Sequence, residues 1–250
     1  DVAVTGVQTC ALPISLASRV PGSPFARRPL VGIFCWAAEE LLTADELRRR
    51  RLRRMLAACD VVGFFSSNQA DVLVEHGVPR ERLALLPFGI DTSQLFGSGS
   101  RERDLDVLSV GWDRGRDYPT LLRALDGSGV RASVVAPHER FSDQAVPDEV
   151  EVLGTVPHAE YRELLARARV VVVPTHDLAY PTGQTVAMEA AAAGCAVVVS
   201  RTAAMEDYFT DTVTAEMPEV GDPDGLRDRV LRDRKSTRLN SSHGYISYAV

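Results

Sequence analysis

The residues with the clearest chemical potential lie between Gly183 and Glu189. The apolar run Val170–Val173 is typical of a buried strand, and it ends at Pro174. A helix that begins beyond the carboxyl end of a parallel strand offers free N–H groups and the positive end of its dipole, which suit a phosphate. Gly183 lets such a phosphate approach the backbone closely.

Three polar side chains follow this glycine. Gln184 and Thr185 begin an Ala-rich segment that predicts a helix, and Glu189 lies about one turn further in. A carboxylate at that depth can accept hydrogen bonds from the two hydroxyls of a ribose. The alternative is that Gly183 only makes a turn and that Glu189 is a solvated helix residue.

The elements that must position these residues alternate between short apolar strands and helices, which predicts an α/β chain with parallel sheets. Strands are expected at residues 30–34, 61–65, 83–86, 105–110, 131–135, 150–153, 170–173 and 196–200. Helices are expected after residues 43 and 66, and at 118–125, 159–168, 184–193 and from 224. A polar, Gly-rich break at residues 88–100 places a domain boundary at about residue 92.

Two helix starts have cap signals. Thr43–Glu46 fits a capping box, and Ser66 with Gln69 fits another cap. The first of these helices then has apolar residues at the spacing of one buried face, which are Leu52, Met55, Leu56 and Cys59.

Composition excludes several classes of protein. The 250 residues are 45% apolar, which supports a packed core, and the net charge of −6 argues against nucleic-acid binding through general positive charge. No apolar run reaches the ~18 residues of a membrane helix, and no secretory signal opens the chain. Four cysteines without CxxC spacing predict reduced thiols in a cytoplasmic protein, and no cluster has metal-ligand spacing.

The two ends differ from the rest of the chain. The only lysine is Lys235, and every basic residue between residues 15 and 232 is arginine. Residues 4–14 (VTGVQTCALPI) and 233–243 (DRKSTRLNSSH) resemble the translation of a short-read sequencing adapter read on its two strands. We therefore expect residues 1–14 and 233–250 to be an adapter artefact and leave them out of the interpretation of the fold.

Five motifs occur in an order that resembles glycosyltransferase family 4. They are FGID at residues 88–91, LSVG at 108–111, VLGTV at 152–156, ARVVVVPT at 168–175 and EAAAAGCAVV at 189–198. The resemblance spans Leu30 to Arg232. It implies the GT-B architecture of two Rossmann-like domains with parallel sheets, with an incomplete acceptor-side domain at residues 15–92 and a donor-binding domain at residues 93–232. It also implies retaining transfer from a nucleotide sugar without a bound metal.

The donor-binding set that we expect from the resemblance and from the residue chemistry together is Gly111, Arg114, Arg116, Gly183, Gln184, Thr185 and Glu189. The family's first donor-sugar glutamate falls at Pro181 here, so the sugar contacts are expected from backbone groups and from Gln184 or Thr185. The family's Arg and Lys for the diphosphate fall at Trp112 and Asp117.

Arg114 and Arg116 lie beside these two positions, and a guanidinium grips phosphate oxygens well. We therefore expect Arg116 to hold the diphosphate. The alternative is that Arg116 pairs with Asp113 or Asp117 at the surface.

A run of six arginines lies within residues 48–54. One interpretation is the solvated face of a helix. The other is attraction to anionic lipid headgroups or to an anionic acceptor, which would bring the protein to the cytoplasmic face of a membrane.

The function that these features predict is transfer of a hexose from a nucleotide-diphosphate sugar to an acceptor hydroxyl with retention, as in polysaccharide or glycolipid biosynthesis. No catalytic side chain is identified. A GT-B nucleotide-sugar epimerase is an alternative, although no pair of acid and base carboxylates is evident. A dinucleotide-binding protein would need GxGxxG after the first strand, which is missing. A further alternative is that the chain itself is an inactive fragment.

Overall fold

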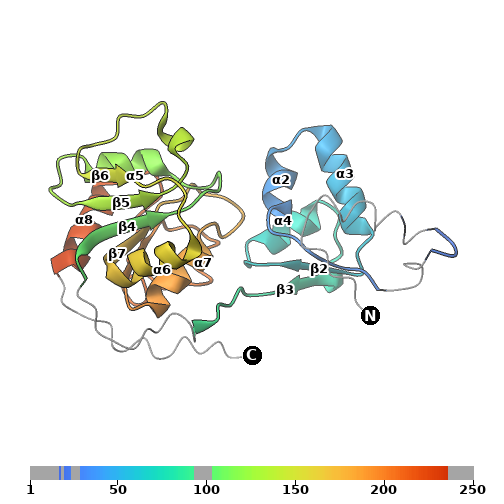
Figure 1. Cartoon of the computed structure of the whole chain (residues 1–250). Helices are drawn as coiled ribbons and strands as arrows, with labels where there is room; N and C mark the ends of the chain where they lie inside the picture. Colours follow the sequence, from blue (N-terminus) through green and yellow to red (C-terminus); the bar gives the residue numbers. More distant parts are fainter. Residues whose placement is uncertain (1–16, 18–19, 24–28, 93–102, 236–250) are drawn as a thin grey trace. The chain divides into compact units, whose positions relative to one another are not determined.

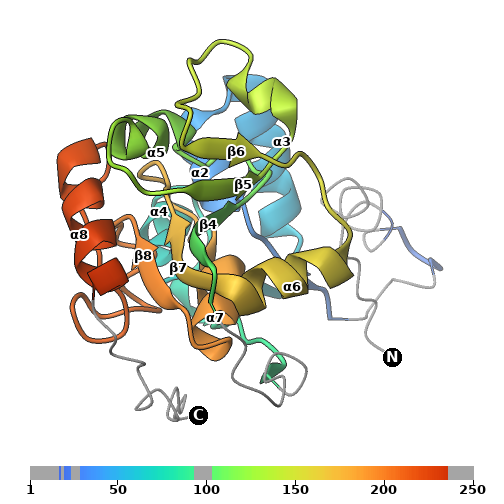
Figure 2. The same ribbon diagram turned by 60° about the vertical axis from the view of Figure 1, so that its left-hand side comes forward.

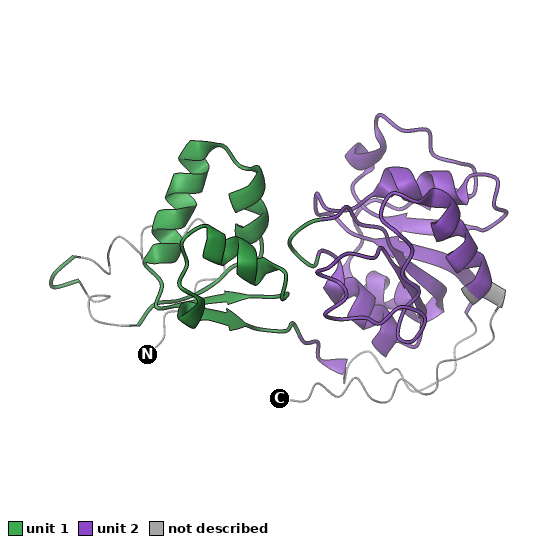
Figure 3. Cartoon of the chain, turned by 180° about the vertical axis from the view of Figure 1, so that it is seen from behind, with its two compact units in different colours: residues 1–88, 178–181 green, residues 89–177, 182–250 purple. Residues whose placement is uncertain are grey.

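The computed structural model describes residues 17, 20–23, 29–92 and 103–235, and the chain forms two compact units (Figures 1 and 3). The first unit extends to Phe88 and includes Leu178–Pro181, and the second unit holds the remaining residues. The first unit ends shortly before the boundary expected at residue 92, and no sequence signal indicated that residues 178–181 belong to it. Residues 1–14 and most of residues 233–250, the expected adapter artefact, lie outside the described part.

The first unit has a parallel sheet covered by three helices. Its strands are β1 (Val31–Ile33), β2 (Val61–Phe64) and β3 (Leu83–Leu85), in that spatial order. Its helices are α2 (Ala37–Thr43), α3 (Glu46–Ala57) and α4 (Gln69–Glu75), and a 3-10 helix lies at Arg80–Arg82. The apolar stripe predicted for α3 is confirmed, because all four of its residues are buried in the core of this unit.

The predicted capping box at Thr43–Glu46 is wrong in its cap residue. Thr43 is the last residue of α2, a helix that the sequence did not indicate, and its hydroxyl donates to the Glu39 carbonyl at 2.8 Å. Asp45 caps α3 instead, since its Oδ1 accepts from the backbone N–H of Arg48 at 2.8 Å. The aspartate was available two residues closer to the helix, and a carboxylate stabilises an N-terminus more than a hydroxyl does.

The predicted pair before α4 forms in the reverse direction. The side-chain oxygen of Gln69 accepts from the backbone N–H groups of Phe65 at 3.0 Å and Ser66 at 3.1 Å. Asn68, not Ser66, is the residue that precedes the helix.

The segment Leu178–Pro181 is held by the first unit through backbone and aromatic contacts. The N–H of Ala179 donates to the buried Glu39 carboxylate at 3.0 Å. The ring of Tyr180 packs on Trp36 with centroids 4.8 Å apart. The position of the family's sugar-contacting glutamate, Pro181, is therefore the end of a segment anchored in this unit.

The second unit has a five-stranded parallel sheet in the order β6-β5-β4-β7-β8. The strands are β4 (Leu105–Val110), β5 (Ala132–Val135), β6 (Val150–Val152), β7 (Ala168–Val173) and β8 (Ala196–Val199). The helices are α5 (Tyr118–Leu125), α6 (His158–Arg167), α7 (Gln184–Ala192) and α8 (Pro223–Lys235), with a 3-10 helix at His138–Phe141. These bounds confirm the strands and helices predicted for residues 105–232 to within a few residues.

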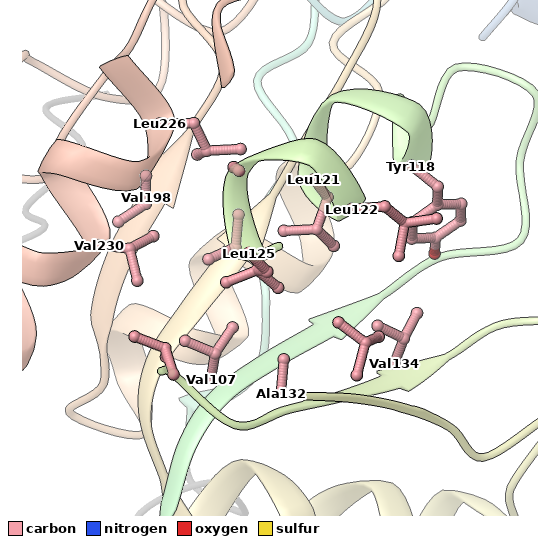
Figure 4. Packing of buried hydrophobic residues seen from close by; sticks show 14 of the residues in the cluster. Val107, Tyr118, Leu121, Leu122, Leu125, Ala132, Val134, Val198, Leu226 and Val230 are labelled. Atoms are coloured by element: carbon pink, nitrogen blue, oxygen red, sulfur yellow. The ribbon is translucent and has the colours of Figure 1, made fainter. Parts of the chain in front are cut away.

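The helices of the second unit cover both faces of its sheet. Figure 2 shows α5 and α8 on one face and α6 and α7 on the other. Leu121 and Leu125 of α5 and Leu226 and Val230 of α8 pack on the strands, as Figure 4 shows. The central strands are almost wholly apolar because both of their faces are buried, which is the pattern of a parallel sheet.

Three of the cysteines lie in the described part, and all three are free thiols. Cys59 and Cys195 are buried, whereas Cys35 is half-buried. Burial raises the pKa of Cys59 to about 11, so this thiol stays protonated at neutral pH. No helix among the described residues is long and apolar enough to cross a membrane.

The cap assignment predicts different costs for two neighbouring substitutions. Asp45→Ala should lower the stability of the first unit by about 1 kcal/mol, because the Arg48 N–H loses its acceptor. Thr43→Ala should cost less than about 0.5 kcal/mol, because α2 is already complete at that residue. Urea unfolding followed by Trp36 fluorescence, in a Trp112→Phe background, measures both. A larger loss for Thr43→Ala would contradict the assignment.

Candidate functional site

The predicted site lies at the carboxyl ends of β4 and β7. These strands are neighbours in the middle of the sheet, and the chain order reverses between them, since β5 and β6 follow on one side and β8 on the other. In open α/β sheets, ligands bind beyond the carboxyl ends of the strands at such a reversal. The loop after β4 spans residues 111–117, and the loop after β7 spans residues 174–183.

Backbone hydrogen bonds join the two loops. The N–H of Asp117 donates to the Pro174 carbonyl at 3.0 Å, and the N–H of His176 donates to the Gly115 carbonyl at 2.9 Å. Arg116 and Thr175 form an antiparallel bridge between them. The position of Arg116 is therefore fixed by main-chain contacts on both of its sides.

The side chain of Arg116 is buried between two glycines. Only 4% of the residue is exposed. A Cβ at Gly111 would lie 1.8 Å from Arg116 Nε, and a Cβ at Gly183 would lie 2.0 Å from Nη1. Any larger residue at either position would displace the guanidinium. Both glycines are thus needed for close approach, and Gly183 also has a positive φ of 85°.

The guanidinium has little compensation in the described part of the chain. Its nearest acid is Asp113, whose Oδ2 lies 3.4 Å from Nε. Nε and Nη1 are buried without a hydrogen-bond partner among the described residues. Such a buried charge is costly unless another acceptor is supplied.

Asp113 makes hydrogen bonds to both segments that surround Arg116. Its Oδ1 accepts from the hydroxyl of Thr182, the residue before Gly183, and from the N–H of Gly115 at 2.9 Å. The carboxylate therefore joins the loop after β4 to the start of α7. The buried hydroxyl of Thr175 lies on the same pair of loops and also lacks a partner among the residues described.

Two further side chains fix the loop after β4. The Tyr118 hydroxyl donates to the Gly111 carbonyl at 2.6 Å, and the pKa of Tyr118 is raised to about 12 by burial, so it remains a donor. Arg140, on the 3-10 helix after β5, donates to the Asp113 carbonyl at 3.1 Å. Neither contact was predicted from the sequence.

Helix α7 begins at this cluster. Gly183 is its N-cap residue and, as a glycine, has no side chain to cap the first turn. Gln184 is buried and Thr185 is half-buried at the helix start. The N-terminal N–H groups and the positive end of the helix dipole therefore lie next to Arg116, where they suit an anion.

Glu189 lies further along α7, half-buried, and its Oε2 accepts from the Tyr161 hydroxyl of α6 at 2.5 Å. The sequence did not identify Tyr161, because a tyrosine among the apolar positions of a helix is indistinguishable from an ordinary core residue. The alternative of a fully solvated Glu189 does not hold.

The other candidate positions differ in surroundings. Arg114 is exposed, and Trp112 is 59% exposed. Asp117 caps α5 by accepting from the N–H of Thr120 at 3.1 Å, which accounts for an aspartate where the family has lysine. The alternative of a surface Arg116 is wrong in location: the residue does pair with Asp113, but it is buried.

No group of three or more His, Cys, Asp and Glu side chains suited to hold a metal ion occurs in the part of the chain that the structure describes.

Comparisons with known proteins concern the sequence family and the fold. Residues 117–233 match the model of the family described as Glycosyl transferases group 1. The matched range is a little under half of the chain, so this part of the chain is similar to glycosyl transferases group 1. The matched range contains α7 with its Gly183 start, Glu189 and Tyr161, whereas Arg116 and Gly111 lie just before it. No curated protein matches the chain in sequence.

Three solved structures illustrate the likeness of the fold. Anabaena Alr3699/HepE in complex with UDP and glucose has a TM-score of 0.76 at 18% identity, over 93% of this chain and 68% of that chain. Sucrose-phosphate synthase from Thermosynechococcus elongatus has a TM-score of 0.65 at 19% identity, over 81% and 58%. WaaG, a glycosyltransferase involved in lipopolysaccharide biosynthesis, has a TM-score of 0.66 at 19% identity, over 86% and 69%.

At these identities the likeness establishes the fold. The chain has the α/β GT-B fold class, built from Rossmann-like units with parallel sheets, as predicted.

The packing of Arg116 against Gly183 predicts that two glycines with a positive φ differ in their tolerance of a side chain. Gly127 has a positive φ of 63° and nothing within 4 Å of an added Cβ, so Gly127→Ala should cost about 1–2 kcal/mol from backbone strain alone. Gly183→Ala should cost about 1–3 kcal/mol more, because the new methyl overlaps Arg116 and Val173. Urea unfolding of the two variants measures this difference, and equal losses would contradict the packing.

Proposed function

We propose that this chain binds the diphosphate of a nucleotide sugar between Arg116 and the N-terminus of α7, with Glu189 at the ribose. We propose further that the protein transfers a hexose from this nucleotide sugar to an acceptor hydroxyl with retention of configuration. The observation that carries the proposal is the buried Arg116 guanidinium, which has two donors without a hydrogen-bond partner in the described residues. Similarity to group 1 supports the transferase class, and the solved neighbour Alr3699/HepE was crystallised with UDP-glucose.

The charge and the donors of the site suit a diphosphate. A guanidinium presents several N–H groups in one plane, which match phosphate oxygens. The first turn of α7 adds backbone N–H groups and the helix dipole. Asp113, the acid that pairs with the guanidinium, is already engaged by Thr182 and Gly115, so an arriving anion would supply acceptors that the described residues do not.

Placed in this way, the same groups would lower the barrier to transfer. When the bond between the sugar C1 and the phosphate oxygen breaks, the electron pair stays on the diphosphate, and Arg116 and α7 stabilise that charge. The acceptor hydroxyl oxygen bonds to C1 on the face that the diphosphate leaves, and its proton passes to an oxygen of the leaving diphosphate. Because Arg116 and the helix provide the positive charge, the proposal requires no metal ion and no other cofactor.

The donor sugar would contact a site unlike that of most family members. Pro181 lacks a carboxylate, and its segment is anchored in the first unit by Ala179 and Tyr180. We therefore assign the sugar contacts to backbone groups and to Gln184 or Thr185.

Isothermal titration of the chain with UDP, ADP and GDP tests the proposal. We expect saturable binding of at least one of them. Arg116→Lys should weaken that binding about tenfold or more, because the lysine loses the planar fork of donors. Arg114→Lys, run in parallel for the other predicted arginine, should lose less, and Arg123→Lys on the outer surface of α5 serves as the neutral control.

The free nucleoside of the same base separates phosphate recognition from base recognition, since its affinity should not change in Arg116→Lys. A folded chain that binds none of the three diphosphates at millimolar concentration would overturn the proposal.

We also propose that the exposed side of α3 approaches an anionic surface such as lipid headgroups. Arg48 forms an ion pair with Glu40, and Arg50 forms one with Glu46, each with an N···O distance of 2.8 Å. Three further exposed arginines of the helix make no such pair in the described residues, and they are Arg51, Arg53 and Arg54. Leu47, 60% exposed on the same helix, adds apolar surface. A helix with this mixture suits the interface of a membrane.

Vesicle co-sedimentation tests this contact. The chain should bind vesicles of phosphatidylglycerol more than vesicles of phosphatidylcholine, and the binding should fall as salt rises. Changing Arg51, Arg53 and Arg54 to Gln should abolish the preference. The matched control changes three other exposed arginines, Arg80, Arg82 and Arg131, to Gln. If both triple variants lose vesicle binding equally, the binding depends on net charge alone, which would contradict a specific role for α3.

A further inference from the structure

Helices α6 and α7 bring together a tyrosine and the carboxylate expected at the ribose. The two helices lie on the same face of the second sheet (Figure 2). The Tyr161 hydroxyl of α6 donates to Oε2 of Glu189 at 2.5 Å. That distance lies in the range of hydrogen bonds from a hydroxyl to an ionised carboxylate.

The surroundings of Tyr161 keep its hydroxyl protonated, so that it acts as the donor of this hydrogen bond. Tyr161 is only 9% exposed. Burial raises its pKa above the ordinary range of tyrosine, and the bond to Glu189 raises the pKa further, so the hydroxyl keeps its proton at neutral pH. Tyr161 is therefore always the donor, and Glu189 always the acceptor.

The other carboxylate oxygen of Glu189 is not engaged in this way. Oε1 accepts no hydrogen bond from the described residues. Glu189 is half-buried, and among the described residues only its Oε2 is held by a side-chain hydrogen bond. A glutamate side chain has several rotatable bonds, and without an anchor it would have to be ordered each time a ligand binds.

We infer that Tyr161 is a positioning residue, which holds the Glu189 carboxylate by Oε2 so that Oε1 is ready to accept from the ribose hydroxyls of the bound nucleotide. This inference rests on the proposed function of the site. It adds that the preference for a nucleotide with ribose hydroxyls depends on a side chain of α6 that does not touch the ligand. An anchored side chain costs less entropy on binding than a mobile one.

The test compares two ligands on four proteins. The ligands are the nucleoside diphosphate that binds best among UDP, ADP and GDP, and its 2′,3′-dideoxy analogue. The proteins are the unaltered chain, Tyr161→Phe, Glu189→Gln and the double variant, all measured by isothermal titration. Tyr161→Phe keeps the ring in the core and removes only the hydroxyl.

We expect Tyr161→Phe to weaken binding of the ribonucleotide about 3- to 10-fold and to leave binding of the dideoxy analogue unchanged. In the Glu189→Gln background, the same substitution should have no further effect. The ratio of the two affinities is measured on one protein sample, so a general loss of stability does not move it.

Three outcomes would overturn the inference. Tyr161→Phe could weaken both ligands equally, which would make the tyrosine merely structural. Tyr161→Phe could lower the thermal midpoint of unfolding without changing the ratio of the affinities for the two ligands, which would also make the tyrosine merely structural. The unaltered chain could bind neither ligand, and that result would overturn the proposed function as well.

Discussion

A positive charge buried between two glycines constrains the whole candidate site. Arg116 fits only because Gly111 and Gly183 have no Cβ, and its guanidinium has one acid, Asp113, at 3.4 Å. A fold keeps a poorly compensated charge in its interior at a cost in stability. Here the charge lies on the loops that follow two neighbouring strands, and the anion that we propose for this place would supply the missing acceptors.

The rest of the second unit holds this charge in place. The reversal of strand order puts the loops after β4 and β7 side by side, and their backbone hydrogen bonds fix the residues around Arg116. Asp113 links the first loop to Thr182, so a hydrogen bond connects the start of α7 to the loop that carries the arginine. Helix α6 then fixes Glu189 through Tyr161. Charge, helix dipole and carboxylate are thus positioned by three separate elements on one sheet.

Periodicity was enough to predict the strands and helices of the second unit, because parallel strands are apolar throughout and the helices have one apolar face. It failed at α2, a helix of only seven residues, and therefore at the cap of α3. Gly183 and Glu189 could be proposed from their spacing. Asp113 and Tyr161 could not, because their partners are distant in sequence, and a side-chain pair between two helices leaves no periodic signal. The same reason explains why residues 178–181 were not expected in the first unit.

The nitrogen resonance of Arg116 Nε tests the central claim most directly. In ¹H–¹⁵N spectra of the chain, assigned with Arg116→Lys, this buried N–H should give a distinct signal. We predict that the signal shifts and saturates as a nucleoside diphosphate is added, together with the amides of Gln184 and Thr185. A nucleotide that shifts resonances elsewhere in the chain, while the Arg116 signal and the start of α7 stay unchanged, would contradict the account.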